Sequence, residues 1–223
     1  MSVTGFNLKP IERETTKEKV YQQIKHVILN GQISSNEIFT EVKMAEHLNT
    51  SRTPVREALQ DLLKEGLIVT VPRKGLTVRK VTESEVEQIF FLRESIEREV
   101  VRKLSGTITE RQLEYLQNIC RDQEEMMKNK DEVSFINLDQ KFHITLAAFA
   151  EYELVKEILL NLHNLSHLIG LRALKKQNRM KEVLEEHLSI IEALQSGEAE
   201  LATQRISKHL ANTNESIKTK WGD

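Results

Sequence analysis

Four side chains in the second half of the sequence have the types and spacing of a metal-binding site. Asp139 and His143 are four residues apart, so they lie on one face if their segment is helical. His187 and His209 stand ten residues before and twelve residues after the turn at Gly197. They are therefore at similar height on antiparallel helices, because a helix rises about 1.5 Å per residue. One carboxylate and three imidazoles suit a divalent transition metal such as zinc or nickel.

Two further histidines keep the ligand set open. His163 lies about as far beyond the turn near Glu151 as His143 lies before it, so these two side chains also match in height. His167 follows on the same predicted helix, and helical periodicity excludes neither residue. Spacing alone therefore predicts a metal site without settling which of these histidines belongs to it.

A second set of side chains, at residues 51–56, has the chemistry of DNA contact. A polar turn gives way there to a helix that opens with Ser51, Arg52, Thr53 and Arg56. Arginine can pair with guanine through two hydrogen bonds, and hydroxyl groups at a helix N-terminus suit phosphate oxygens. Each residue alone could be a cap or a solvated charge. Their order is that of a helix-turn-helix, which predicts DNA binding.

Three helices are predicted to position this second set. Capping signals open helices after Thr15 and Thr40. A third helix is predicted to begin at Thr53-Pro54, with the hydroxyl as its cap and proline at the first helical position. Gly66 ends that helix, because glycine adopts the left-handed conformation freely. A short helix, a turn and a second helix are thereby expected over residues 40–66.

The residues that follow predict a β-hairpin with a basic tip. Residues 67–71 and 76–78 are rich in β-branched and apolar side chains. The turn between them carries Arg73, Lys74 and Gly75. Such a tip fits a wing that touches the adjacent DNA backbone or minor groove.

From residue 82 onward the sequence predicts helices alone. Capping boxes begin the first two, at Thr82 and Thr109, and four more are expected over residues 132–149, 152–175, 179–195 and 198–219. Short connections between six helices predict an antiparallel bundle. We therefore expect a mainly α fold, in which a winged helix-turn-helix over residues 10–80 precedes an all-helical bundle over residues 82–218.

Charge and composition agree with this division. The chain has a net charge of −2, but residues 1–80 carry 13 basic and 9 acidic side chains, whereas residues 81–223 carry 19 and 25. A basic part beside an acidic remainder favours a polyanion-binding module joined to a second unit. The single cysteine, Cys120, excludes a disulfide framework, and no run approaches the ~18 apolar residues of a membrane span. We expect a cytoplasmic protein with no membrane partner.

The amino-terminal motifs resemble those of a known family. Residues 51–59, 65–67 and 72–75 are similar to the winged-helix domain of the GntR family of bacterial transcription regulators, and the resemblance covers about residues 10–80. It implies operator DNA as a partner, contacted by Arg52, Thr53 and Arg56, with Ser51 and the wing tip Arg73, Lys74 and Gly75 in support. Val42 departs from the pattern, because many members carry an arginine there.

The carboxyl-terminal motifs resemble the FCD ligand-binding domain of the FadR subgroup. The likeness rests on residues 138–143, 186–187 and 209–210, covers about residues 82–218, and has the six-helix length of the VanR-like branch. It implies a small organic acid as effector beside a metal bound by Asp139, His143, His187 and His209. Arg93 matches a position near that pocket and could pair with the effector's carboxylate. Its alternative is a surface ion pair with Glu97, four residues on.

Together these features predict a homodimeric transcription regulator, which represses from a palindromic operator and responds to a metabolite. One alternative is a zinc-dependent hydrolase that uses the bundle site. It lacks support because no His-Glu-x-x-His motif occurs, and because Glu186 points about 100° away from its neighbour His187 on a helix. A second alternative is a regulator whose metal is purely structural.

Overall fold

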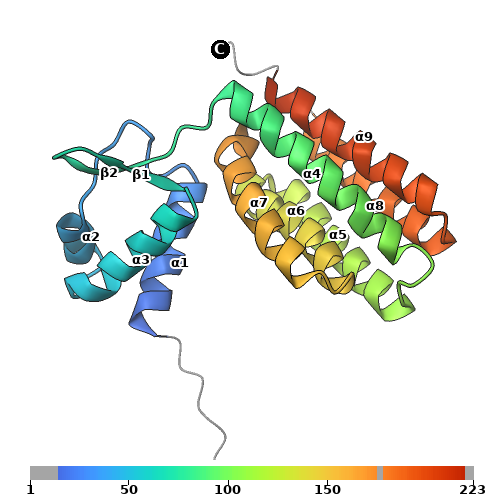
Figure 1. Ribbon diagram of the computed structural model, residues 1–223, viewed down its shortest axis with the longest axis horizontal. Coiled ribbons are helices and arrows are strands. Elements are labelled where there is room, and N and C mark those ends of the chain that lie inside the picture. Colours follow the sequence, from blue (N-terminus) through green and yellow to red (C-terminus); the bar gives the residue numbers. More distant parts are fainter. Residues whose placement is uncertain (1–14, 175–177, 219–223) are drawn as a thin grey trace, which may run out of the picture.

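The computed structural model describes residues 15–174 and 178–218, and it confirms a mainly helical fold. Figure 1 shows a small unit of helices and a hairpin beside a larger bundle of long helices. The predicted start at residue 10 and the predicted helix ends at 175 and 219 lie outside the described residues. Among the described helices, none is long and apolar enough to span a membrane.

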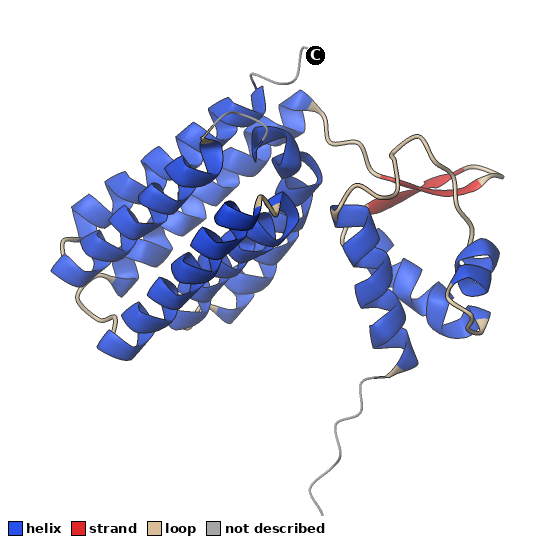
Figure 2. Ribbon diagram, turned by 180° about the vertical axis from the view of Figure 1, so that it is seen from behind, coloured by secondary structure: helices blue, strands red, loops and turns tan. Residues whose placement is uncertain are grey.

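The amino-terminal unit has the element order of a winged helix. Its elements are α1 (Thr16–Leu29), α2 (Glu41–His47), α3 (Arg52–Lys64), β1 (Ile68–Val71) and β2 (Gly75–Val78). The predicted caps are present, since the side chains of Thr15 and Thr40 accept hydrogen bonds from backbone N–H groups at the starts of α1 and α2. The two strands pair antiparallel and form the wing, seen in red in Figure 2.

One helix boundary differs from the prediction. α3 begins at Arg52 with Ser51 as its N-cap, and not at Thr53-Pro54 with Thr53 as the cap. Pro54 is therefore the third residue of the helix. Proline is tolerated there because the first four backbone N–H groups of a helix have no acceptor within it. The side chain of Ser51 makes no capping hydrogen bond, so its hydroxyl is not committed to the helix end.

The carboxyl-terminal unit is a bundle of six helices, as predicted. These are α4 (Glu83–Leu104), α5 (Glu110–Asn129), α6 (Glu132–Phe149), α7 (Glu153–Leu174), α8 (Arg179–Ser196) and α9 (Ala199–Lys218). Capping boxes open α4 and α5 at Thr82 and Thr109. Apolar side chains from all six helices form one buried core. Polar residues inside that core therefore need partners from neighbouring helices.

Helix α7 contacts the amino-terminal unit through polar and apolar side chains. Asn164 on α7 is 1% exposed, and its Nδ2 donates to Glu65 Oε2 at 3.1 Å. Glu65 is the C-cap of α3, and the same oxygen accepts from Lys25 Nζ at 2.8 Å. The Oδ1 of Asn164 accepts from Gln140 Nε2 on α6 at 3.1 Å. Leu168 packs against the core of the winged helix. One buried asparagine thus connects the end of α3 to α6.

Candidate metal centre and nucleic-acid interface

The four predicted metal ligands come together inside the bundle. Helix α6 supplies two of them, α8 one and α9 one, and a ligand atom from each lies within 4.8 Å of the others: Asp139, His143, His187 and His209. His143 Nε2 is 3.1 Å from His209 Nε2. His187 Nε2 is 3.4 Å from a carboxylate oxygen of Asp139. The three histidines are at most 1% exposed. We call these four residues the candidate metal centre.

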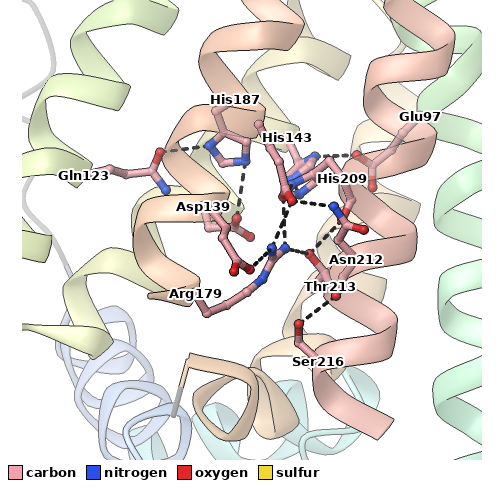
Figure 3. A network of polar contacts seen from close by, with 12 residues as sticks. Glu97, Gln123, Asp139, His143, Arg179, His187, His209, Asn212, Thr213 and Ser216 are labelled. Atoms are coloured by element: carbon pink, nitrogen blue, oxygen red, sulfur yellow. Dashed lines mark hydrogen bonds and ion pairs between the residues drawn. The ribbon is translucent and has the colours of Figure 1, made fainter. Parts of the chain in front are cut away.

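Two of these histidines are oriented by partners on their other ring nitrogen, and Figure 3 shows the partner of His187. His187 Nδ1 is 2.9 Å from the side-chain oxygen of Gln123 on α5. His209 Nδ1 is 2.7 Å from Glu186 Oε2 on α8. An acceptor at Nδ1 holds the proton on that nitrogen and leaves Nε2 with a free lone pair. Both lone pairs therefore face the interior of the centre.

The third histidine is oriented by Glu97, which sequence reasoning had linked only to Arg93. His143 Nδ1 pairs with one carboxylate oxygen of Glu97, and the other oxygen accepts from Arg93 Nε at 2.9 Å. The predicted pairing of Arg93 with Glu97 at i, i+4 therefore occurs, but its predicted surface location is wrong, because both side chains are 3% exposed. Helix α4 turns this face toward the bundle interior. Arg93 Nη2 is buried without a hydrogen-bond partner.

The electrostatics of the centre favour neutral imidazoles beside an ionised carboxylate. Burial holds the pKa of His187 well below its usual range, and a proton on the neighbouring His209 would lower it further. Burial also lowers the pKa of His209, against the opposing hydrogen bond to Glu186. Burial disfavours the charged form of Asp139, but attraction to Arg93 and to the surrounding histidines, when these are protonated, outweighs burial and lowers the pKa of that carboxyl. Neutral nitrogens and a carboxylate are the forms that bind metals.

The rival histidines lie beside this centre on α7. His163 forms a second cluster with Glu97 and His143, and its Nε2 is 3.6 Å from Glu97 Oε1. Both other members of that cluster already have partners outside it. Glu97 pairs with Arg93, and His143 belongs to the candidate metal centre. His167 belongs to neither cluster, although it is 3% exposed. The described residues thus offer one grouping with three converging Nε2 atoms.

A cavity adjoins the candidate metal centre. It has a volume of about 40 Å³, and Asp139 forms part of its wall. The other polar side chains around it are Arg93, Gln140, His163, Ser166, His167, Arg179 and Thr213. Its apolar wall includes Phe90, Phe135, Ile136, Val183 and Ile217. An apolar cavity with a few convergent polar groups is the usual form of a small-molecule site.

Arg179 is a buried residue of this cavity that sequence reasoning missed. It is 1% exposed, and its guanidinium donates to both carboxylate oxygens of Glu186 at 2.9 and 3.0 Å and to Thr213 Oγ1 at 2.8 Å. Glu186 in turn holds His209, so Arg179 is linked to the metal centre through one carboxylate. The spacing of seven residues between Arg179 and Glu186 spans two turns and could have indicated the pair.

The predicted DNA-contacting residues lie at the exposed N-terminal end of α3. Ser51, Arg52, Thr53 and Arg56 are all exposed. Sequence reasoning missed a partner from α2, because Arg56 donates through Nε and Nη2 to the two carboxylate oxygens of Glu41, at 2.9 and 3.0 Å. In this pair the exposed side chain of Arg56 points toward α2.

The wing tip combines exposed charge with a glycine of structural importance. Arg73 and Lys74 are exposed. Gly75 has φ +138°, and a Cβ built on it would lie 2.5 Å from the carbonyl oxygen of Phe39. Phe39 pairs with Leu76 by a β-bridge, which brings the two backbones this close. A glycine is therefore needed at position 75, because the backbone of Phe39 leaves no room for a side chain. This packing also sets the position of the wing tip that carries Arg73 and Lys74.

An exposed basic helix end, a basic wing and a bundle with a ligand cavity define a class, that of DNA-binding transcription regulators. Comparison with family models gives the family. The model of bacterial regulatory proteins of the gntR family matches residues 16–78, and the FCD domain model matches residues 88–212. The chain belongs to the GntR family of transcription regulators and carries an FCD domain. Membership identifies a regulator, and not the hydrolase considered as an alternative.

Individual relatives agree with this assignment. The uncharacterized HTH-type transcriptional regulator YdhC of Bacillus subtilis is 28% identical, over 89% of each chain. The HTH-type transcriptional repressor RspR of Escherichia coli is 27% identical, over 92% of this chain and 90% of that one. The solved structure of E. coli McbR/YncC has a TM-score of 0.81 at 20% identity, and covers 93% of this chain and 99% of its own. That likeness supports the fold alone.

Proposed function

We propose that this chain is a metal-dependent repressor that binds a palindromic operator as a homodimer in the cytoplasm and is controlled by a small organic acid. In this proposal residues 10–80 read the DNA and residues 82–218 bind metal and effector and form the dimer. The observation that carries it is the candidate metal centre, with its three oriented imidazoles and one carboxylate beside a cavity. Repression agrees with the name of the relative RspR.

The residues of the centre fit a divalent transition metal. His187 Nε2 is buried and has no hydrogen-bond partner in the described structure. A buried nitrogen without a partner is costly, and a metal ion would satisfy it. Asp139, His143, His187 and His209 would hold the ion, with zinc or nickel suited to such a donor set. When bound, the ion would supply a Lewis-acid anchor for an oxygen of the effector.

Arg93 supports a carboxylate as the group to be recognised. Its Nη2 is buried without a partner, and the side chain lines the cavity beside Asp139. A guanidinium N–H forms strong, charge-assisted hydrogen bonds with carboxylate oxygens. The cavity could hold about three water molecules, on the scale of 10–15 Å³ for each, so the acid should be small.

The contact between α7 and α3 supplies a route from the cavity to the DNA. Gln140 lines the cavity and donates to Asn164, which donates to Glu65 at the end of α3. An effector that binds Gln140 or moves α6 would change this hydrogen-bonded path. It would alter operator affinity only by its differential affinity for the two arrangements of the winged helices.

Fluorescence anisotropy with a labelled DNA fragment from upstream of the protein's own gene tests the DNA part. We expect affinity to fall steeply with salt, since log K decreases with log salt by about 0.9 for each phosphate contact. Lys181→Ala serves as control, because Lys181 is exposed on α8 and paired with Glu185. Absent or salt-insensitive binding would overturn the proposal.

Chelation tests the metal part on the same fragment. Removal of the metal should abolish any response of DNA binding to small acids. If chelation lowers the melting temperature while no acid changes either melting or DNA binding, the metal is purely structural, and the effector part of the proposal is wrong.

A further inference from the structure

The wall of the cavity contributed by α7 holds two histidines that the candidate metal centre does not use. His163 and His167 are four residues apart, each is 3% exposed, and both line the cavity. Neither ring nitrogen of His167 has a hydrogen-bond partner in the described structure, and His163 Nε2 also lacks one. Buried polar atoms without partners are rare in folded proteins. Unpartnered polar atoms on a cavity wall therefore indicate which hydrogen-bonding groups a bound ligand would carry.

The donor and acceptor pattern of His167 matches a hydroxyl group. Burial lowers the pKa of His167 to about 4, so the ring is neutral near pH 7. A neutral imidazole has one N–H donor and one acceptor nitrogen. A carboxylate can only accept, and would leave the acceptor nitrogen of the ring unpaired. A hydroxyl group both donates and accepts, so it can pair with a neutral imidazole in either direction.

The buried charges around the cavity limit the ligand to one negative charge. Arg93 with Glu97 and Arg179 with Glu186 form two neutral pairs. Arg179 also contacts Glu182, but the side chain of Glu182 is 40% exposed, so solvent screens its charge and it is not counted among the buried charges. Asp139 then contributes one negative charge, and a divalent cation in the candidate metal centre would contribute two positive charges. The net is one positive charge, which a monocarboxylate cancels. A second carboxylate would remain buried and uncompensated, which is unfavourable.

We propose that His167 is a specificity residue that hydrogen-bonds a hydroxyl group of the effector, and that the effector is a small monocarboxylic hydroxy acid. This inference rests on the proposed function, because it takes the acid to lie beside the metal in the cavity. Residue spacing left His167 open as a possible metal ligand. In this inference His167 recognises the effector instead.

Matched acids test the inference on the full-length, zinc-loaded protein. Calorimetric titration would compare lactate with propionate and glycolate with acetate, because each pair differs by one hydroxyl group. Malonate adds a dicarboxylate of similar size. We expect at least about tenfold tighter binding of the hydroxylated member in at least one pair, and weaker binding of malonate than of that acid. Equal affinities within both pairs, or tightest binding of malonate, would overturn the inference.

Two variants test whether His167 is responsible for the preference for hydroxylated acids. His167→Phe removes both polar atoms at similar volume, and should bring the affinities for the hydroxylated and unhydroxylated members of each pair to within about twofold of each other, whatever their absolute values. His167→Gln keeps one donor and one acceptor and should retain part of the preference, which also covers the case in which the first variant fails to fold. Elemental analysis should find about one metal ion per chain in both. Loss of metal in either variant would make His167 a ligand and overturn the inference.

The outcomes separate this inference from the proposed function. If acids bind and release DNA but the hydroxyl group has no effect, only the inference fails. If no acid in the panel binds to the zinc-loaded protein, and a metal response of DNA binding persists, the effector part of the proposed function is overturned and the inference with it.

Discussion

The two regions that carry function use charged side chains in opposite ways. At the DNA-facing end of α3, Arg56 pairs with Glu41 while its side chain remains 58% exposed. Inside the bundle, Arg179 pairs with Glu186, and their side chains are 1% and 14% exposed. Arg179 also donates to Thr213, and Glu186 also pairs with His209. An exposed ion pair contributes about 0–1 kcal/mol, whereas removing one partner of a buried pair costs several. Partners in the first region can exchange easily, and partners in the second cannot.

This difference agrees with what each region has to bind. A DNA reader meets its ligand at an open surface, so Arg56 can leave Glu41 for a phosphate or a base at little cost. A metal centre needs its ligands oriented before the ion arrives, because neutral nitrogens must converge within a few ångströms. Variants in the two regions should therefore change different measurements by different amounts.

Loss of metal is the largest expected effect. The double substitution of His187 and His209 by alanine removes two of four ligands, and should lower metal content from about one ion per chain to near zero. Elemental analysis of protein purified without added metal measures this. His47→Ala is the matched control, because His47 is an exposed histidine on α2. Unchanged metal content in the double variant would show that the candidate metal centre is wrongly assigned.

Arg52→Ala should have the second largest effect, on DNA. The side chain is exposed at the start of α3, where residues reach base edges or phosphates. We expect operator affinity to fall by roughly 5- to 150-fold, which corresponds to ~1–3 kcal/mol for a specific contact. Anisotropy at fixed salt measures it, and metal content should remain unchanged. Equal affinity for wild type and variant would remove Arg52 from the interface.

Glu186→Gln should weaken metal binding without abolishing it. Glu186 holds His209 at 2.7 Å and Arg179 at 2.9 Å, so the variant loses the charge that orients the ligand. A change in such a partner usually lowers metal affinity by about 10- to 100-fold. Competition with a chromogenic chelator measures the constant. Glu185→Gln is a close control, since Glu185 is the neighbouring residue and is 63% exposed. Equal constants for the two variants would contradict an orienting role.

The sequence predicted which four side chains converge in the bundle better than it predicted the partners of these side chains, for physical reasons. Asp139 and His143 share a helix face because they are four residues apart. His187 and His209 lie at similar distances on either side of the turn at Gly197, so they are at similar height. Both relations can be derived from residue spacing in the sequence alone. Gln123 lies alone on α5, and only the packing of α5 against α8 brings it to His187. The Arg56–Glu41 pair depends in the same way on how α2 crosses α3. Contacts set by packing between helices have no fixed spacing in the chain.

The burial of Arg93 is a related case. Its partner Glu97 was found by i, i+4 spacing, but two charged residues one turn apart are usually on the surface. A bundle core that contains histidines can accept such a pair, since His143 shares Glu97. The start of α3 was missed by two residues for a simpler reason, because Ser51 and Thr53 are both good caps and proline is allowed at either resulting position.

A smaller effect is expected from pH in the metal-free protein. The pKa of His167 is about 4 in the folded chain and about 6.5 when unfolded. The unfolded state therefore binds more protons, and the contribution of His167 to stability is complete above pH 6.5 and declines as the pH falls toward 4. Between these values wild type should lose up to ~1.4 kcal/mol per pH unit more than His167→Phe. Urea unfolding at several pH values measures the difference, and parallel curves would contradict it.

Glu41→Gln should have the smallest effect and tests the exposed region directly. The substitution removes the charge that holds Arg56, and releases this guanidinium at a cost of less than about 1 kcal/mol in stability. It also removes a negative charge from beside the DNA-facing helix. Operator affinity should therefore rise by a few-fold, most clearly at low salt, where charges are least screened. If affinity falls instead, Glu41 is needed to orient Arg56 for its contact, and this part of the surface is as pre-arranged as the metal centre.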